Sequence, residues 1–431
     1  MLRANKIPTS VVLLGAAHHA GLAIARSLGT LGVQVFVIDA NARAPAFFSR
    51  YSCGRYQWDL KSAGVDESIA FLRNVADQIG QRPILIPTTD HAALFVVDHA
   101  DALSRSYLFP RQLAATSHAL VSKKAMFELA ARSGIPTPAT FAPQATADVL
   151  NFLGTAQFPV VIKADDGARP WRSTANTKCI VHGPQELMEQ YERMQDPEVP
   201  NVVFQEYIPG GEDTIWMFNG YFNAKSECLF GMTGQKLRQC PAYTGAACLA
   251  ICLHNQEVYD LTIDFMKSVG YQGILDIGYR YDARDGKYKV LDVNPRIGAT
   301  FRLFVRPDGL DVARALYLDL TEQDIPEALP FAEGRKWIVE DCDLISSFRY
   351  FRDGKLAAKQ WARSFKDIEE CSFVSLRDPL PMLAVFISDL FELTARSRKI
   401  FSPGNAAQPA VPVDATTAGT RRTANQRSYR P

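Results

Sequence analysis

The feature that most constrains the fold of this 431-residue chain is a predicted β-hairpin in its second half. Residues 274–281 are rich in β-branched and aromatic side chains, and residues 288–293 supply a second run of strand character. Asp285-Gly286 stands between the two runs and is a strong turn signal. The pattern therefore predicts two antiparallel strands joined by a tight turn.

Polar side chains gather at the end of the second predicted strand. Asp292, Asn294 and Arg296 occupy alternate positions, so we expect them on one face, with Asp276 of the first strand beside them. Carboxylate and amide oxygens are ligands that suit Mg²⁺, and arginine suits phosphate. The cluster predicts a site for metal-bound phosphate groups. The alternative interpretation is a solvated strand end.

Composition and charge argue against several classes of function. The chain is 47% hydrophobic and carries 47 basic and 46 acidic residues, so nothing suggests a nucleic-acid or membrane surface. No run approaches the ~20 apolar residues of a membrane span, and residues 11–14 are too short a run for a signal peptide. The eight cysteines form no CxxC pair and no Cys/His zinc spacing. They are typical of reduced thiols, which predicts a cytoplasmic protein.

The length predicts several domains rather than one. Residues 1–116 have the alternating strand and helix pattern of a small doubly wound α/β domain, and residues 117–320 form a larger region that contains the hairpin. Residues 321–397 have mixed signals and predict an α+β extension, in which residues 344–350 look like a strand. The last part, residues 398–431, has almost no large apolar side chains and is predicted to be disordered.

A glycine-containing loop opens the first predicted domain. It spans residues 15–21, between short apolar runs that fit buried parallel strands, and the second run ends at Asp39. A dinucleotide site would place pyrophosphate on the following helix and ribose on Asp39, which makes an NAD(P)-dependent oxidoreductase one hypothesis. Ala17 occupies the position where that fingerprint requires its second glycine, so the signal is weak.

Two lysines in the next segment stand where a ligand is expected. Lys123 opens a predicted helix that ends before Gly134-Ile135-Pro136, and Lys163 follows the buried run Val160-Val161-Ile162. A lysine in such a run needs a paired charge or a ligand, or else it extends out of an edge strand. The polar loop over residues 165–173 is open to two interpretations, a phosphate cover or an ordinary connection.

These features occur in one order along the chain, and together they resemble the ATP-grasp ligase superfamily. The resemblance covers about residues 1–320 and rests on Lys123, Lys163, the segment Glu206-Tyr207-Ile208 with Glu212, and Asp292-Val293-Asn294-Pro295-Arg296. It implies an α/β and α+β architecture: a preATP-grasp-like domain over 1–116, two ATP-grasp lobes over about 117–200 and 201–320, and the C-terminal extension.

The resemblance also implies a role for each matching residue. Lys123 and Lys163 would contact nucleotide phosphates. Adenine would bind Glu206 and the backbone of Tyr207 and Ile208, and the ribose hydroxyls would bind Glu212. Mg²⁺, with Mn²⁺ as an alternative ion, would bind Asp292 and Asn294. Arg296 would face the transferred phosphate, together with a basic pair, Lys236 and Arg238. These two residues alternate before Cys240-Pro241, so we expect both side chains on one face.

One position departs from the family pattern. The family places a second acidic metal ligand on the first strand of the hairpin, and counting back from Asp292 through the turn puts Gly278 there. Asp276 lies two residues earlier and therefore on the same face, about 6.5 Å along the strand. It is our candidate for the replacement ligand, and a weakly held metal or impaired catalysis is the alternative.

The function implied by the resemblance is ATP-dependent joining of a carboxylate to an amine through an acyl phosphate. Such catalysis needs positioned cations and metal rather than a covalent nucleophile, and the sequence offers no convincing Ser/His/Asp or Cys/His set. The alternatives are an ATP-binding regulatory protein and, with less support, the oxidoreductase. The expected partners are a small acid and a small amine, without nucleic acid or membrane, and homodimerisation is an open option.

The sequence does not identify the acid or the amine. Candidates for holding the acid are Arg302 and Arg306, one helical turn apart if the segment is helical, together with Lys236, Arg238 and the loop over residues 88–91. The two arginines are equally compatible with ordinary surface charges.

Overall fold

The computed structural model describes residues 8–165, 178–196, 199–327, 329 and 331–387. The chain divides into one compact unit, Met1–Phe386, and a second unit, Ile387–Pro431. Everything below concerns the first unit. The predicted boundaries at residues 116 and 320 both fall inside it and stay predictions. The predicted disordered tail and most of the loop over residues 165–173 lie outside the described residues.

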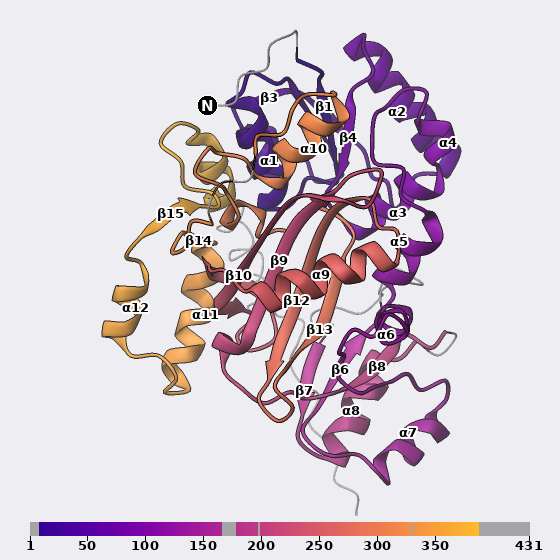
Figure 1. Ribbon diagram of the computed structural model, residues 1–431, viewed down its shortest axis with the longest axis vertical. Coiled ribbons are helices and arrows are strands. Elements are labelled where there is room, and N and C mark those ends of the chain that lie inside the picture. The colour runs from indigo at the N-terminus through magenta and orange to yellow at the C-terminus, as the bar shows by residue number, and fades with distance from the viewer. Residues whose placement is uncertain (1–7, 166–177, 197–198, 328, 330, 388–431) are drawn as a thin grey trace, which may run out of the picture. The chain divides into compact units, whose positions relative to one another are not determined.

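The N-terminal part is the predicted doubly wound α/β fold. Its parallel sheet has the order β3-β2-β1-β4 (Figure 1). Successive side chains of β1 enter two different hydrophobic clusters, because both faces of a parallel sheet are covered. The elements are β1 (Val11–Leu14), α1 (His19–Gly29), β2 (Val35–Asp39), η1 (Pro45–Phe48), β3 (Ser52–Gln57), α2 (Val65–Ile79), β4 (Ile84–Pro87), α3 (Asp90–Asp98), α4 (Ala100–Leu103) and α5 (Ala114–Val121).

A second, antiparallel sheet carries Lys163. Its order is β5-β8-β6-β7, and α7 and α8 pack on it through one apolar cluster. Helix α6 precedes this sheet and begins at Lys123, where the side chain of Ser122 accepts a hydrogen bond from the backbone of Ala125. The elements are α6 (Lys123–Arg132), β5 (Thr140–Phe141), α7 (Thr146–Leu153), β6 (Val160–Ala164), β7 (Lys178–Val181), α8 (Pro184–Met194) and β8 (Val202–Glu206).

The predicted hairpin is confirmed and forms one edge of a seven-stranded sheet with the order β13-β12-β9-β10-β11-β14-β15. Gly286 adopts φ +70° in the turn, a conformation that favours glycine. Helix α9 crosses one face of this sheet (Figure 1). The elements are η2 (Glu212–Thr214), β9 (Ile215–Phe222), β10 (Cys228–Cys240), β11 (Ala246–Cys252), α9 (Gln256–Ser268), β12 (Gly273–Asp282), β13 (Lys287–Asn294), η3 (Phe301–Leu303) and α10 (Val312–Leu320).

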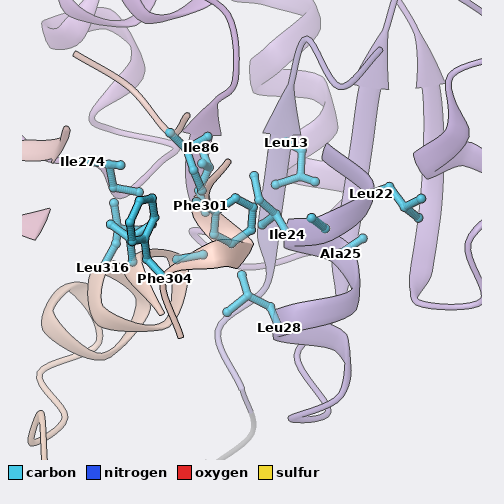
Figure 2. Packing of buried hydrophobic residues seen from close by; sticks show 14 of the residues in the cluster. Leu13, Leu22, Ile24, Ala25, Leu28, Ile86, Ile274, Phe301, Phe304 and Leu316 are labelled. Atoms are coloured by element: carbon cyan, nitrogen blue, oxygen red, sulfur yellow. The ribbon is translucent and has the colours of Figure 1, made fainter. Parts of the chain in front are cut away.

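The N-terminal sheet and the seven-stranded sheet share one hydrophobic core. Figure 2 shows Leu13 and Ile86 of the first sheet and Leu28 of α1 in the same cluster as Phe301 and Phe304. Each of these five side chains is at most 2% exposed. The shared core fixes the ends of β1 and β4 relative to the end of the hairpin, which is where the candidate site lies.

The C-terminal extension is part of the large sheet, because its strands β14 (Lys336–Ile338) and β15 (Ile368–Cys371) pair at the edge next to β11. The prediction of a strand over residues 344–350 was wrong. These residues lie in α11 (Glu340–Arg352), which is followed by α12 (Ala358–Ser364). A short apolar run does not by itself distinguish helix from strand, and here the buried face is the polar one, with Asp343, Ser346, Ser347 and Tyr350.

Candidate nucleotide and metal site

A cavity of about 520 Å³ lies at the end of the hairpin, between the two antiparallel sheets and the N-terminal domain. It brings together seven of the residues predicted from the sequence. Other polar and glycine positions line it as well, and four of them enter the description below. The predicted residues are Lys123, Lys163, Lys236, Asp276, Asp292, Asn294 and Arg296, and the four others are Asp90, Lys178, Gly278 and Arg280.

The hairpin register places the acidic and amide side chains as the sequence predicted. Gly278 pairs with Asp292, and Asp276 pairs with Asn294, whose amide nitrogen donates to the Asp276 carboxylate at 3.2 Å. The register shifts directly after Gly278, so Leu291 has no partner across the ladder. The carbonyl of Leu291 instead accepts a hydrogen bond from Nζ of Lys163, at 3.1 Å.

The pKa values of the two carboxylates in this cluster are shifted in opposite directions. Burial would raise the pKa of Asp292, but the charges of Lys123 and Lys163 and a hydrogen bond from Nζ of Lys123 hold it well below its usual range. For Asp276 burial dominates over the attraction of Arg296 and raises the pKa to about 6. Asp292 is therefore charged at neutral pH, whereas Asp276 takes up a proton as the pH falls through about 6.

Three lysines line the cavity together: Lys163, which is buried, and Lys178 and Lys236, which are half-buried. Lys163 and Lys178 are direct cross-strand partners on β6 and β7, an arrangement that destabilises a sheet when both are charged. Burial and the neighbouring Lys178 lower the pKa of Lys163, and burial and Lys236 lower the pKa of Lys178 to about 8. Burial also lowers the pKa of Lys236, although Asp276 and Asp292 oppose the shift. Such a cluster is stabilised by a polyanionic ligand.

Arg296 reaches across to the N-terminal domain. Its guanidinium donates to both carboxylate oxygens of Asp90, at 2.7 and 3.2 Å. Asp90 is the first residue of α3 and belongs to the loop over residues 88–91 that the sequence nominated for substrate binding. The ion pair therefore connects that loop directly to the cavity.

The residues expected to bind adenine and ribose lie beside this cavity rather than in it. Tyr207 and Glu212 line a second cavity of about 520 Å³, which shares Arg280 with the first. The guanidinium of Arg280 lies over the Tyr207 ring, 5.5 Å from its centroid. Ile208 is 2% exposed, and Glu206 accepts hydrogen bonds from the backbone of Ala139 and, at 2.5 Å, from Arg284.

The expectation that Lys236 and Arg238 share one face was wrong. The pairing of β10 with β11 is irregular on both sides of Arg238, so alternation fails there. The Lys236 side chain lines the cavity, whereas the Arg238 side chain is 5% exposed and donates to both carboxylate oxygens of Asp343, at 2.7 and 3.0 Å. Arg238 thus anchors the extension to β10.

Arg302 and Arg306 do not form the suggested carboxylate clamp. Arg302 lies in the short helix η3 and pairs with Asp311 and Glu370. Arg306 lies beyond that helix and pairs with Asp308. Neither arginine lines the cavity, and the pair with Glu370 connects Arg302 to the extension.

Sequence reasoning missed Lys178 and Arg280 as site residues. Alternation along β12 places Arg280 on the same face as Asp276, so that signal was present in the sequence. Lys178 could be identified only from the pairing of β7 with β6, which places it opposite Lys163. Asp90 was nominated only as part of the loop over residues 88–91, and its ion pair with Arg296 depends on the packing of the N-terminal domain against the hairpin.

The donor set fits a magnesium ion that is also bound by phosphate. Asp276, Asn294 and Asp292 supply two carboxylates and one amide at one cavity wall. The described residues contain no group of three or more His, Cys, Asp or Glu side chains that could hold a metal. Mg²⁺ is commonly bound by only one or two carboxylates together with substrate phosphates. At Gly278 an added Cβ would meet open space, so no neighbour fills the position of the absent carboxylate.

Comparison with known proteins supports the same fold. No family model matches the chain. The curated D-aspartate ligase of Enterococcus faecium is 24% identical over 243 residues, which are 54% of this chain and 57% of that relative's length. The chain thus matches little more than half of the relative.

Solved structures show the similarity over most of the described unit. N5-carboxyaminoimidazole synthetase from Staphylococcus aureus has a TM-score of 0.57 at 12% identity, over 77% of this chain and 82% of that one. L-amino acid ligase from Bacillus licheniformis has a TM-score of 0.55 at 16% identity, over 73% and 75%. The biotin carboxylase domain of 2-oxoglutarate carboxylase from Hydrogenobacter thermophilus, a dimer solved with MgADP, has a TM-score of 0.58 at 15% identity, over 77% and 73%.

The chain has the ATP-grasp fold, and the resemblance drawn from its sequence is confirmed at that level. Among the residues that the structure describes, no helix has the length and apolar character needed to cross a membrane.

Proposed function

We propose that the protein is an ATP-dependent ligase that joins a carboxylate to an amine. The observation that carries the proposal is the single cavity in which Lys123, Lys163 and Lys178 face Asp292 and Asn294. The cations suit a polyphosphate, and the oxygen donors suit its metal. The names of the similar proteins support the same class, because they include a D-aspartate ligase and an L-amino acid ligase.

In this proposal the γ-phosphoryl group of ATP passes to a carboxylate oxygen of the acid, the bond between β- and γ-phosphates breaks, and ADP leaves. The amine nitrogen then attacks the acyl carbon, phosphate departs with the former carboxylate oxygen, and the nitrogen loses a proton. Lys163 and Lys178 hold the phosphates, and Lys236 and Arg296 stabilise charge near the transferred group.

Asp292, Asn294 and Asp276 would hold Mg²⁺, with Mn²⁺ as an alternative ion of the same donor preference. The metal would neutralise charge on the β- and γ-phosphate oxygens. Asp276 accepts a hydrogen bond from Asn294, which supports its assignment as the replacement for the ligand absent at Gly278.

Amino acids are the proposed substrate class. This proposal rests on the printed substrates of two similar proteins and on a cavity that offers cations for a carboxylate and Asp90 for an ammonium group. Homodimerisation and a cytoplasmic location stay predictions.

One observation favours a second candidate, an ATP-binding regulatory protein. Gly278 leaves the metal cluster one carboxylate short of the family pattern, and a regulator would bind ATP without consuming it. The oxidoreductase hypothesis gains no support, because Asp39 is 5% exposed and accepts a hydrogen bond from the backbone of Asn41, at 2.7 Å.

The test is a screen of D- and L-amino acids in pairs, D-aspartate included, for Mg²⁺-dependent release of ADP. The ligase proposal expects ADP and an amide in equal amounts for at least one pair, and a large loss in the Lys163→Met variant. Tight ATP binding without ADP release from any pair would favour the regulatory candidate.

A further inference from the structure

Tyr350 of α11 connects the C-terminal extension to the residue expected to bind ribose. Its hydroxyl donates to Oε1 of Glu212 at 2.6 Å. The hydroxyl oxygen of Tyr350 in turn accepts hydrogen bonds from the backbone N–H groups of Gln239, at 3.4 Å, and Tyr243, at 3.3 Å. One hydroxyl thus joins the short helix η2, the end of β10 and the loop that follows β10.

The position of Tyr350 is fixed by other contacts of its helix. The ion pair of Arg238 with Asp343 and the hydrogen bond from Ser346 to the carbonyl of Gln239 attach the first half of α11 to β10. Tyr350 itself is 4% exposed, and its ring lies 4.8 Å from that of Tyr243 in an edge-to-face arrangement. A rigid helix therefore presents the hydroxyl to Glu212.

Glu212 lines the second cavity together with Tyr350. Tyr350 binds one oxygen of the carboxylate, which leaves the second oxygen for a ligand. A carboxylate oxygen held in one orientation is a strong acceptor for a hydroxyl group, because little conformational freedom remains to be lost on binding. Without the Tyr350 hydroxyl, the half-buried Glu212 side chain would sample other rotamers.

We propose that Tyr350 is a positioning residue for the nucleotide ribose, and that the C-terminal extension is therefore a wall of the nucleotide site. The inference rests on the proposed function, since it requires that the chain binds ATP. It goes beyond that function by assigning the extension a role in distinguishing ribose from deoxyribose.

The Tyr350→Phe variant tests the proposal, because it keeps the ring contact with Tyr243 and removes only the hydroxyl. Tyr221→Phe is a matched control. The Tyr221 side chain is 1% exposed, and its hydroxyl donates to Asp319 at 2.6 Å, between β9 and α10 and outside both cavities. Isothermal titration calorimetry would measure Kd for ADP, 2′-deoxyADP and 3′-deoxyADP with Mg²⁺.

We expect the wild-type chain and Tyr221→Phe to prefer ADP over at least one deoxy analogue, by about 30-fold, the value of one oriented charge-assisted hydrogen bond. In Tyr350→Phe the preference should fall at least fivefold. An unchanged preference, or equal weakening of all three nucleotides, would overturn the inference but not the proposed function. A wild-type chain that binds none of the three nucleotides would overturn both.

Discussion

Replacement of Lys163 by methionine tests whether the lysine cluster exists for phosphate. The Lys163 side chain is 7% exposed, and Nζ donates to the carbonyl of Leu291 at 3.1 Å. Methionine preserves most of the stem but removes the ammonium group. A charge-assisted hydrogen bond contributes about 2 kcal/mol, so the Kd for MgADP should rise about 30-fold, at 1.4 kcal/mol per tenfold.

The same change should leave the ligand-free protein as stable as before or more stable. Burial and the charge of Lys178 lower the pKa of Lys163 in the folded chain, so the unfolded chain binds more protons between the folded and unfolded pKa values. Stability of the wild-type chain therefore rises with pH across that interval, and the variant should lose part of this rise. Weaker binding with unchanged or higher stability is the signature of a functional site.

Calorimetric titration with MgADP and urea unfolding at pH 7 and pH 9 would measure both effects. Lys267→Met, at an exposed position in the last turn of α9, is the control and should change neither quantity. An unchanged Kd in Lys163→Met would refute the assignment of phosphate binding to this cluster. A large loss of stability would show that Lys163 has a structural role instead.

Three further predictions concern the cavity and the attachment of the extension to β10. Gly278→Asp adds a carboxylate in open space opposite Asp292, so the Mg²⁺ concentration that gives half-maximal ADP binding should fall about tenfold. A rise in this concentration would contradict the metal assignment. Arg238→Gln leaves the buried carboxylate of Asp343 without its ion pair, so the free energy of unfolding measured in urea should fall by about 3–5 kcal/mol. A loss of activity at full stability would instead support a catalytic role for the arginine. Burial lowers the pKa of Lys178 to about 8, so its attraction for phosphate is lost as the pH rises. The affinity for MgADP, measured by titration, should fall about tenfold from pH 7 to pH 9 and should fall less in Lys178→Met. Equal falls in the two proteins would refute the assignment of Lys178 to phosphate binding.

The hairpin and its polar end were predictable from the sequence because their signals are local. Strand composition, the Asp285-Gly286 turn and alternation were sufficient to place Gly278 opposite Asp292. The role of Lys163 as a site residue was predictable for a different reason. A charged group within an apolar strand needs a partner or a ligand wherever the strand lies.

The errors occurred where tertiary pairing decides the local geometry. The side-chain direction of Arg238 depends on irregular pairing between β10 and β11, which strand alternation does not predict. Arg302 is bound by Glu370, and Glu212 by Tyr350, over sequence separations of 68 and 138 residues. No local pattern indicates such contacts, so the contribution of the extension to the site was visible only in the structure.

The most direct test of the ligase proposal follows the oxygen atoms of the acid. A productive amino-acid pair would be incubated with ATP after the carboxylate of the acid is labelled with ¹⁸O, and the released phosphate analysed by mass spectrometry. The acyl-phosphate route predicts ADP as the nucleotide product and one ¹⁸O atom in each phosphate. Phosphate without ¹⁸O, or AMP that carries the label, would contradict it.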